Sequence, residues 1–147
     1  MSLAERIQAD LTAAMKAREE LRLSTLRMVR SAMQYAQVEK RAELSDDDVL
    51  GVLSRQAKQR RESAEEFRKG NRPELAAKEE AEAAIIAEYL PQQLTESELR
   101  ALVSEAIAAT GAASAKDLGK VMGWLSPKTK GRADGRQLSN LVRAALA

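Results

Sequence analysis

SDDDVLGVLSRQAKQRRESAEEFRKGN, residues 45–71, is the stretch of sequence that decides the fold class. It begins with a serine and three aspartates, a helix cap followed by an acidic first turn that favours the positive end of a helix dipole. It ends at Gly70-Asn71, a typical helix stop. Between these signals opposite charges recur four residues apart, as in Lys58 and Glu62, a spacing that stabilises helices. The stretch therefore predicts one long helix.

Helical periodicity continues on both sides of this segment, and no stretch alternates apolar and polar residues as a strand would. Capping residues and prolines predict six further helices. They begin at Ser2, near Glu20, at Asn71 with Pro73 in the first turn, at Thr95 with a stop at Gly111, at Ser114 with a stop at Pro127, and at Asp134. We expect an all-α fold: an N-terminal helical region with long helices and a small C-terminal three-helix domain.

The Pro91-Gln92-Gln93 segment is the predicted domain boundary, because charge balance and glycine content change across it. Residues 1–90 contain 16 basic and 17 acidic side chains, whereas residues 91–147 contain 8 and 5. We therefore expect an N-terminal domain over residues 1–90 and a basic tail domain over residues 91–147.

The predicted helix over residues 20–39 has two apolar stripes, so it is expected to be covered on two sides. The stripes are Leu26-Val29-Met33-Ala36 and Leu21-Met28-Tyr35. Arginines flank these stripes and continue along the next helix: Arg27, Arg30, Arg55, Arg60 and Arg61. Two interpretations stay open for them. They pair with acidic residues and hold helices together, or they form a second basic surface.

Composition excludes several classes of function. The 147-residue chain contains no Cys and no His, which removes disulfides, thiolate nucleophiles, the usual metal ligands and the common proton shuttle at neutral pH. We expect no catalytic residue, no metal and no cofactor. No apolar run follows the first residues, and the longest uncharged stretch has ten residues, too short for a membrane span. These features predict a cytoplasmic protein without a membrane partner.

Glycine is concentrated in residues 116–136, where Gly119, Gly123, Gly131 and Gly135 make up four of the seven glycines in the chain. Gly119 and Gly123 lie one turn apart inside a predicted helix, where each costs about 1 kcal/mol relative to alanine. This cost indicates that another backbone approaches the helix closely. A crossing helix of this chain, a nucleic-acid backbone or a partner peptide would each account for it.

The same region is rich in cations. The predicted nucleic-acid-binding residues are Lys116, Lys120, Lys128, Lys130, Arg132, Arg136 and Arg143. Residues 128–136 form a basic loop that leads into a helix N-terminus, where N–H groups and guanidinium groups suit phosphate oxygens. A solvated run of charge is the alternative. Trp124 is the one aromatic residue of this region, so it offers few rings on which bases could stack. We therefore expect recognition of RNA shape and backbone, and no sequence-specific DNA binding.

Several segments resemble the GatB/YqeY family. GKVMG at 119–123, PK at 127–128 and KGRADG at 130–135 are similar to the family's tail domain, and 22–29, 52–60 and 88–94 are similar to its stand-alone YqeY-type members. The resemblance implies an all-α protein of two parts. It also implies a tail related to the tRNA-contacting end of the B subunit of the glutamine-dependent tRNA amidotransferase, and an association with carbon–nitrogen ligase activity that uses glutamine as amide donor.

These observations lead to one hypothesis and two alternatives. The hypothesis is a non-catalytic, tRNA-binding accessory module whose partner is tRNA or a tRNA-handling enzyme. The alternatives are a component of a glutamine-dependent amidotransferase and a helical scaffold that binds proteins. The chain is not expected to catalyse amide transfer alone, because it contains no amidase-like Gly-Ser stretch, no Cys-His glutaminase pair and no glycine-rich ATP loop.

Overall fold

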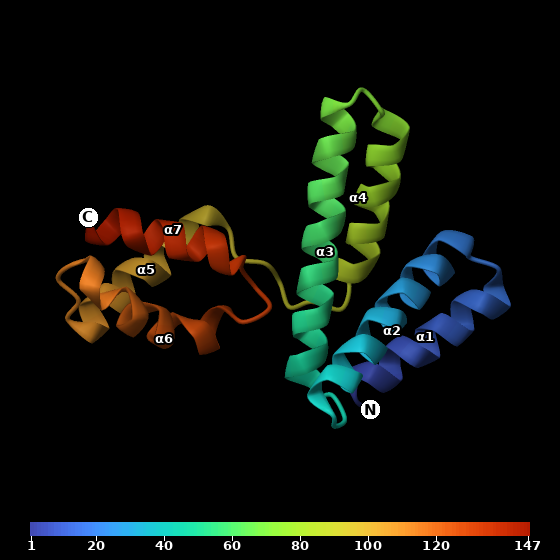
Figure 1. Ribbon diagram of the computed structural model, residues 1–147, viewed down its shortest axis with the longest axis horizontal. Coiled ribbons are helices and arrows are strands. Elements are labelled where there is room, and N and C mark those ends of the chain that lie inside the picture. Colours follow the sequence, from blue (N-terminus) through green and yellow to red (C-terminus); the bar gives the residue numbers. More distant parts are fainter. The chain divides into compact units, whose positions relative to one another are not determined.

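The computed structural model describes residues 1–147 and contains seven α-helices, one short 3₁₀ helix and no β-strand (Figure 1). The prediction of an all-α fold is confirmed. The chain forms two compact units, Met1–Leu90 and Pro91–Ala147, and each contains its own buried apolar cluster. None of the helices combines the length and the hydropathy that a membrane span requires.

The N-terminal unit begins with a helical hairpin made of α1 (Leu3–Ala17) and α2 (Glu20–Lys40). Ser2 caps α1, because its hydroxyl oxygen accepts the backbone N–H of Glu5 at 3.1 Å. Helix α1 ends at Arg18, which adopts the left-handed conformation with a φ of 58°. The chain reverses there, and α2 returns alongside α1.

A second hairpin is formed by α3 (Asp46–Lys69) and α4 (Pro73–Ala87), as Figure 1 shows. Ser45 and Asp48 form the reciprocal capping box that opens α3. The expectation that Asn71 opens α4 is wrong: Asn71 lies in the turn with a φ of 58°, and Arg72 occupies the N-cap position. Asparagine tolerates this left-handed conformation, so the turn uses its backbone rather than its capping side chain.

The core of the N-terminal unit lies where the two hairpins meet. Its buried members are Ile7, Leu11, Leu26, Val29, Val49, Leu53, Ala57, Ile85, Ile86 and Tyr89. Further along α3 and α4 the buried contacts are made by small side chains, Ala64, Ala76 and Ala83, which allow the two helices to pack closely.

The two stripes on α2 are covered to different extents. Leu26 and Val29 are completely buried, whereas the side chain of Tyr35 is 77% exposed and Leu21 is 39% exposed. The expectation that α2 is covered on two sides is therefore wrong for its C-terminal half. The core that α2 shares with the other helices forms on the Leu26–Val29 side and leaves Tyr35 facing solvent.

The C-terminal unit is a three-helix bundle of α5 (Glu96–Thr110), α6 (Leu118–Thr129) and α7 (Gly135–Leu146). Thr95 caps α5 by accepting the N–H of Glu98 at 3.1 Å, and Gly111 ends it with a φ of 67°. All three helices contribute to the core, whose buried members are Leu99, Val103, Ala106, Val121, Leu125, Leu138, Val142 and Leu146.

Helix α6 differs from its predicted limits at both ends. Ser114 and Asp117 form their capping box on a 3₁₀ turn, Ala115–Asp117, labelled η1, and α6 starts after it. Pro127 lies inside α6 instead of stopping it. Proline removes the bond to the carbonyl four residues earlier, here that of Gly123, and its ring crowds that carbonyl. The last turn is supported by Thr129, whose buried hydroxyl donates to the Leu125 carbonyl at 3.0 Å.

Candidate nucleic-acid interface

The η1 turn and α6 together present one solvent-exposed face with small and basic residues. Each of its members has another three or four residues away, which places them on one side of a helix. They are Lys116, Gly119, Lys120, Gly123 and Pro127, and all of them are exposed. The opposite side carries Val121 and Leu125, which are fully buried in the bundle. Hydrophobic packing thus fixes the orientation of the exposed face, called the α6 face below.

No part of the chain covers the two glycines of this face. A methyl group at Gly119 or Gly123 would meet no atom within 4 Å. The crossing helix considered from the sequence is therefore absent, and packing within this chain does not offset the helix-propensity cost of about 1 kcal/mol per glycine. Gly135 likewise faces open space. Gly131 differs, because its φ of 73° is a conformation that favours glycine in the loop after α6.

The lysines of the C-terminal unit have different environments. Lys116 and Lys120 are exposed on the α6 face. Lys128 lies over the ring of Trp124, with its Nζ atom 4.3 Å from the ring centroid, so a cation–π contact holds it on the helix. Trp124 itself is half-buried and packs against the apolar core of the C-terminal unit. Lys130 follows at the end of α6 and is exposed.

Asp117 lies between Lys116 and Lys120 in the sequence. Its carboxylate accepts the backbone N–H groups of Ala113 at 2.8 Å and Ser114 at 3.4 Å. These two bonds, with a smaller contribution from Lys120, hold the pKa of Asp117 below its ordinary value. The carboxylate therefore stays charged but is committed to the cap of η1.

Arg132 has a structural role in the loop between α6 and α7. Its Nε–H donates to the carbonyl of Gln92 at 3.1 Å, and its own carbonyl accepts the N–H of Leu94 at 2.9 Å. The side-chain amide of Gln93 donates to the Gly131 carbonyl at 2.7 Å. These bonds join the start of the unit to the basic loop. Gln92 and Gln93 were not expected to support the loop, because their partners lie about forty residues away in the sequence.

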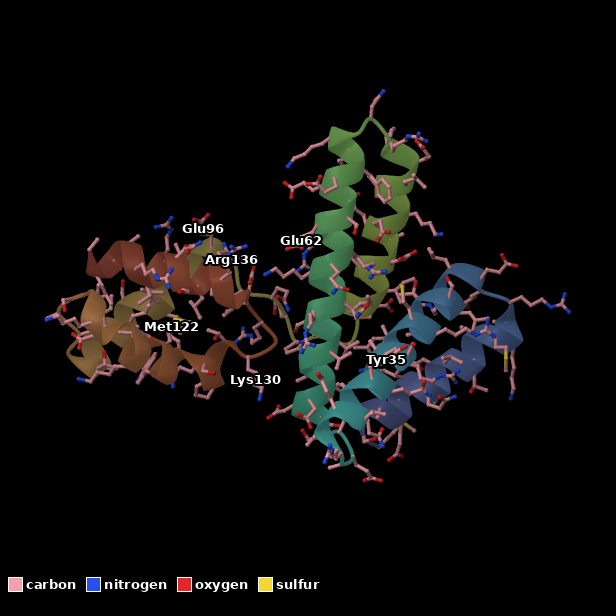
Figure 2. All side chains as sticks on the ribbon, viewed as in Figure 1. Tyr35, Glu62, Glu96, Met122, Lys130 and Arg136 are labelled. Atoms are coloured by element: carbon pink, nitrogen blue, oxygen red, sulfur yellow. The ribbon has the colours of Figure 1, made fainter.

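Arg136 and Arg143 lie on α7, seven residues apart and both exposed. The N-terminus of α7 is not open for a phosphate, because the side chain of Asp134 already accepts the N–H of Arg136 at 3.0 Å. In Figure 2, Arg136 lies on the same side of the unit as Glu96, and Lys130 lies on the other side. Lys130 and Arg136 therefore do not share one surface, and Lys116 and Lys120 are the cations beside the uncovered glycines inside α6, Gly119 and Gly123.

Arginines of the N-terminal unit fall into two groups. Arg60 pairs with Glu79 at 3.6 Å and with the buried Glu82 at 3.8 Å, so it holds α3 and α4 together as the pairing interpretation requires. By contrast Arg27, Arg55 and Arg61 are exposed. No group of three or more acidic side chains is placed to hold a metal ion.

Comparison with known proteins identifies relatives over almost the whole chain. A family model described as Yqey-like protein matches residues 4–146. A protein of Pyrenophora tritici-repentis named altered inheritance of mitochondria protein 41, mitochondrial, is 31% identical over 141 residues, covering 94% of this chain and 77% of the relative. A protein of the same name from Lachancea thermotolerans is 31% identical over 147 residues, covering 95% and 76%.

These relatives correct one expectation from the sequence. Both carry names that state a mitochondrial location, which contradicts the prediction of a cytoplasmic protein. That prediction depended on the residues at the start of the chain and on the absence of a long apolar run. Neither property reports the compartment in which a folded helical protein works.

Proposed function

Because this chain belongs to the YqeY-like family and presents an uncovered basic helix face, we propose that it is a non-catalytic accessory protein that binds RNA, with tRNA as the main target. The observation that carries the proposal is the combination of Lys116 and Lys120 with two glycines that nothing in the chain covers. The resemblance of residues 119–135 to the tRNA-contacting tail of the amidotransferase B subunit supports the same target.

The geometry of the α6 face suits a sugar–phosphate backbone. Consecutive turns of an α-helix are about 5.4 Å apart along the axis, so Lys116 and Lys120 place their ammonium groups about one turn apart. Each ammonium group can donate to phosphate oxygens. Gly119 lies between the two lysines and Gly123 follows one turn later; neither has a side chain, so a strand of RNA can approach the helix backbone closely. Contacts of this kind position a nucleic acid without reading its bases.

A binding titration of the full chain with fluorescently labelled bulk tRNA, at several salt concentrations, tests the proposal. Each phosphate contact contributes a slope of about 0.7–0.9 to the dependence of log K on log salt. The variant Lys116→Ala/Lys120→Ala is expected to bind more weakly and to lower this slope by about 1.5. The matched control is Arg55→Ala/Arg61→Ala, which removes two exposed arginines from the other unit.

The control keeps the comparison specific, since both variants change the net charge equally. Equal losses in the two variants would show that only overall charge matters, and the α6 face would then have no particular role. An unchanged slope in the lysine variant would contradict the proposal directly.

The open glycines also suit a second candidate function, the docking of a partner helix. Small residues four positions apart allow two helices to approach closely. A protein partner of this kind would bind with little dependence on salt and would tolerate the loss of Lys116 and Lys120. Salt-insensitive binding to a protein that is lost on Gly123→Leu would favour this function over RNA binding.

A further inference from the structure

The exposed half of α2 carries a group of side chains that the α6 face does not explain. Tyr35 and Val38 are each 77% exposed, the most exposed large apolar side chains of the chain apart from Met1. With Ser31 and Gln34 they line a surface hollow of about 280 Å³. Figure 2 labels Tyr35 on this helix. An aromatic ring held in solvent beside amide and hydroxyl groups has no role in the core of the unit.

The charged residues that precede this hollow on α2 after Glu20 are all basic, and Glu39 follows it. Residues 21–38 contain three arginines and no acidic residue. Arg22 is paired with Glu88, at the end of α4, at 2.9 Å and with Glu19, the N-cap of α2 itself, at 3.3 Å, so it is committed to these ion pairs. Arg27 is exposed and forms no ion pair, and Arg30 makes only a weak bond to Gln8 at 3.5 Å. Two exposed guanidinium groups thus precede Tyr35 on the same helix, Arg30 by five residues and Arg27 by eight.

We propose that this face of α2 is a second RNA contact, at which an unpaired base stacks on Tyr35 while Arg27 and Arg30 hold the adjacent phosphates. Base stacking on an aromatic side chain is typical of single-stranded binding, and arginines supply the electrostatic attraction. Gln34 and Ser31 offer donors and acceptors to a base edge. The site goes beyond the α6 face because its residues belong to the N-terminal unit.

The observations favour RNA over a second copy of the chain at this face. A stable dimer interface buries about 800 Å² on each partner. The exposed half of α2 supplies only two large apolar side chains, which are too few for such an area. Arg27 and Arg30, which precede the hollow on α2 and form no ion pair, favour a polyanion instead.

The test is a titration of the full chain with a labelled single-stranded RNA 12-mer of mixed sequence, followed by fluorescence anisotropy. Tyr35→Ala is expected to weaken binding about tenfold, whereas Tyr35→Phe stays within about twofold of the parent, because the ring can still stack. Arg27→Ala/Arg30→Ala is expected to weaken binding more than the matched pair Arg55→Ala/Arg61→Ala. Each variant changes exposed side chains, so the fold is expected to survive.

The titrations are repeated in the Lys116→Ala/Lys120→Ala background, where the effect of Tyr35→Ala is expected to persist. The effect of the α6 face on RNA affinity and the effect of the α2 site on RNA affinity are then measured separately, so either proposal can fail without the other. Unchanged binding of the Tyr35→Ala variant would overturn the proposal. A dimer in sedimentation analysis that dissociates on Tyr35→Ala would overturn it in favour of a self-association surface.

Discussion

Replacing Gly123 by alanine is expected to stabilise the protein and to weaken its binding to RNA. Gly123 lies in the middle of α6, and a methyl group there meets no atom within 4 Å. The substitution therefore causes no clash, and alanine is favoured over glycine in a helix interior by about 1 kcal/mol. Part of the gain comes from the smaller conformational freedom of the unfolded chain. For a unit of this size the gain corresponds to an increase in Tm of about 4–8 °C.

Trp124 provides the assay for this change. It is the single tryptophan of the chain, and it packs on the core of the C-terminal unit, so its emission reports the unfolding of that unit. Gly111→Ala is the matched control, because Gly111 has a φ of 67° that an alanine adopts only with strain. We expect the control to lower the free energy of unfolding by about 1 kcal/mol.

The two readouts of Gly123→Ala move in opposite directions if the reasoning is right. The added methyl group keeps an RNA backbone from approaching α6 as closely as the glycine allows, so affinity for tRNA falls while stability rises. A variant that is less stable than the parent would show that this chain covers Gly123 after all. A more stable variant with unchanged affinity would refute a close backbone approach at this face.

Three further predictions concern stability. The bond from Lys40 lowers the pKa of Asp48 to about 2, below its value in the unfolded chain. The charged carboxylate therefore stabilises the folded protein above about pH 4, and this stabilisation is lost as the pH falls towards 2. Asp48→Asn should flatten the dependence of Tm on pH in this window. Arg60→Ala leaves the buried Glu82 without its partner and should cost about 3 kcal/mol in urea unfolding, whereas a loss below about 0.5 kcal/mol would show that the pair is not desolvated. Leu125→Ala empties a fully buried position and should cost about 2–5 kcal/mol by the same measurement, unless the bundle collapses around the cavity.

Helix starts could be predicted from the sequence because capping is local chemistry. Ser2, Ser45 and Thr95 each accept an N–H group three residues ahead, so both partners are visible in a short window of sequence. The errors arose where one signal has two possible uses. Asn71 can cap a helix or occupy a left-handed turn, and Pro127 can stop a helix or be tolerated within it. The neighbouring structure decides between these uses.

The candidate site was predictable in composition but not in arrangement. Lysines and glycines at turn spacing identify the α6 face, because residues 116, 120 and 123 fall on one side of any helix. Spacing along one helix could not show that Arg132 bonds to Gln92 within the loop, or that Arg136 and Lys130 lie on different sides of the unit. Those relations join residues that are far apart in the sequence or lie on separate elements.

The sequence by itself determined the all-α fold and the apolar stripes, because both depend on interactions between residues a few positions apart. Only the tertiary structure decided which surfaces remain uncovered. Gly119 and Gly123 could have packed against a crossing helix, and Tyr35 could have been buried beneath one, but no helix of their own unit covers them. Exposure depends on how whole helices pack, a property that no local pattern encodes.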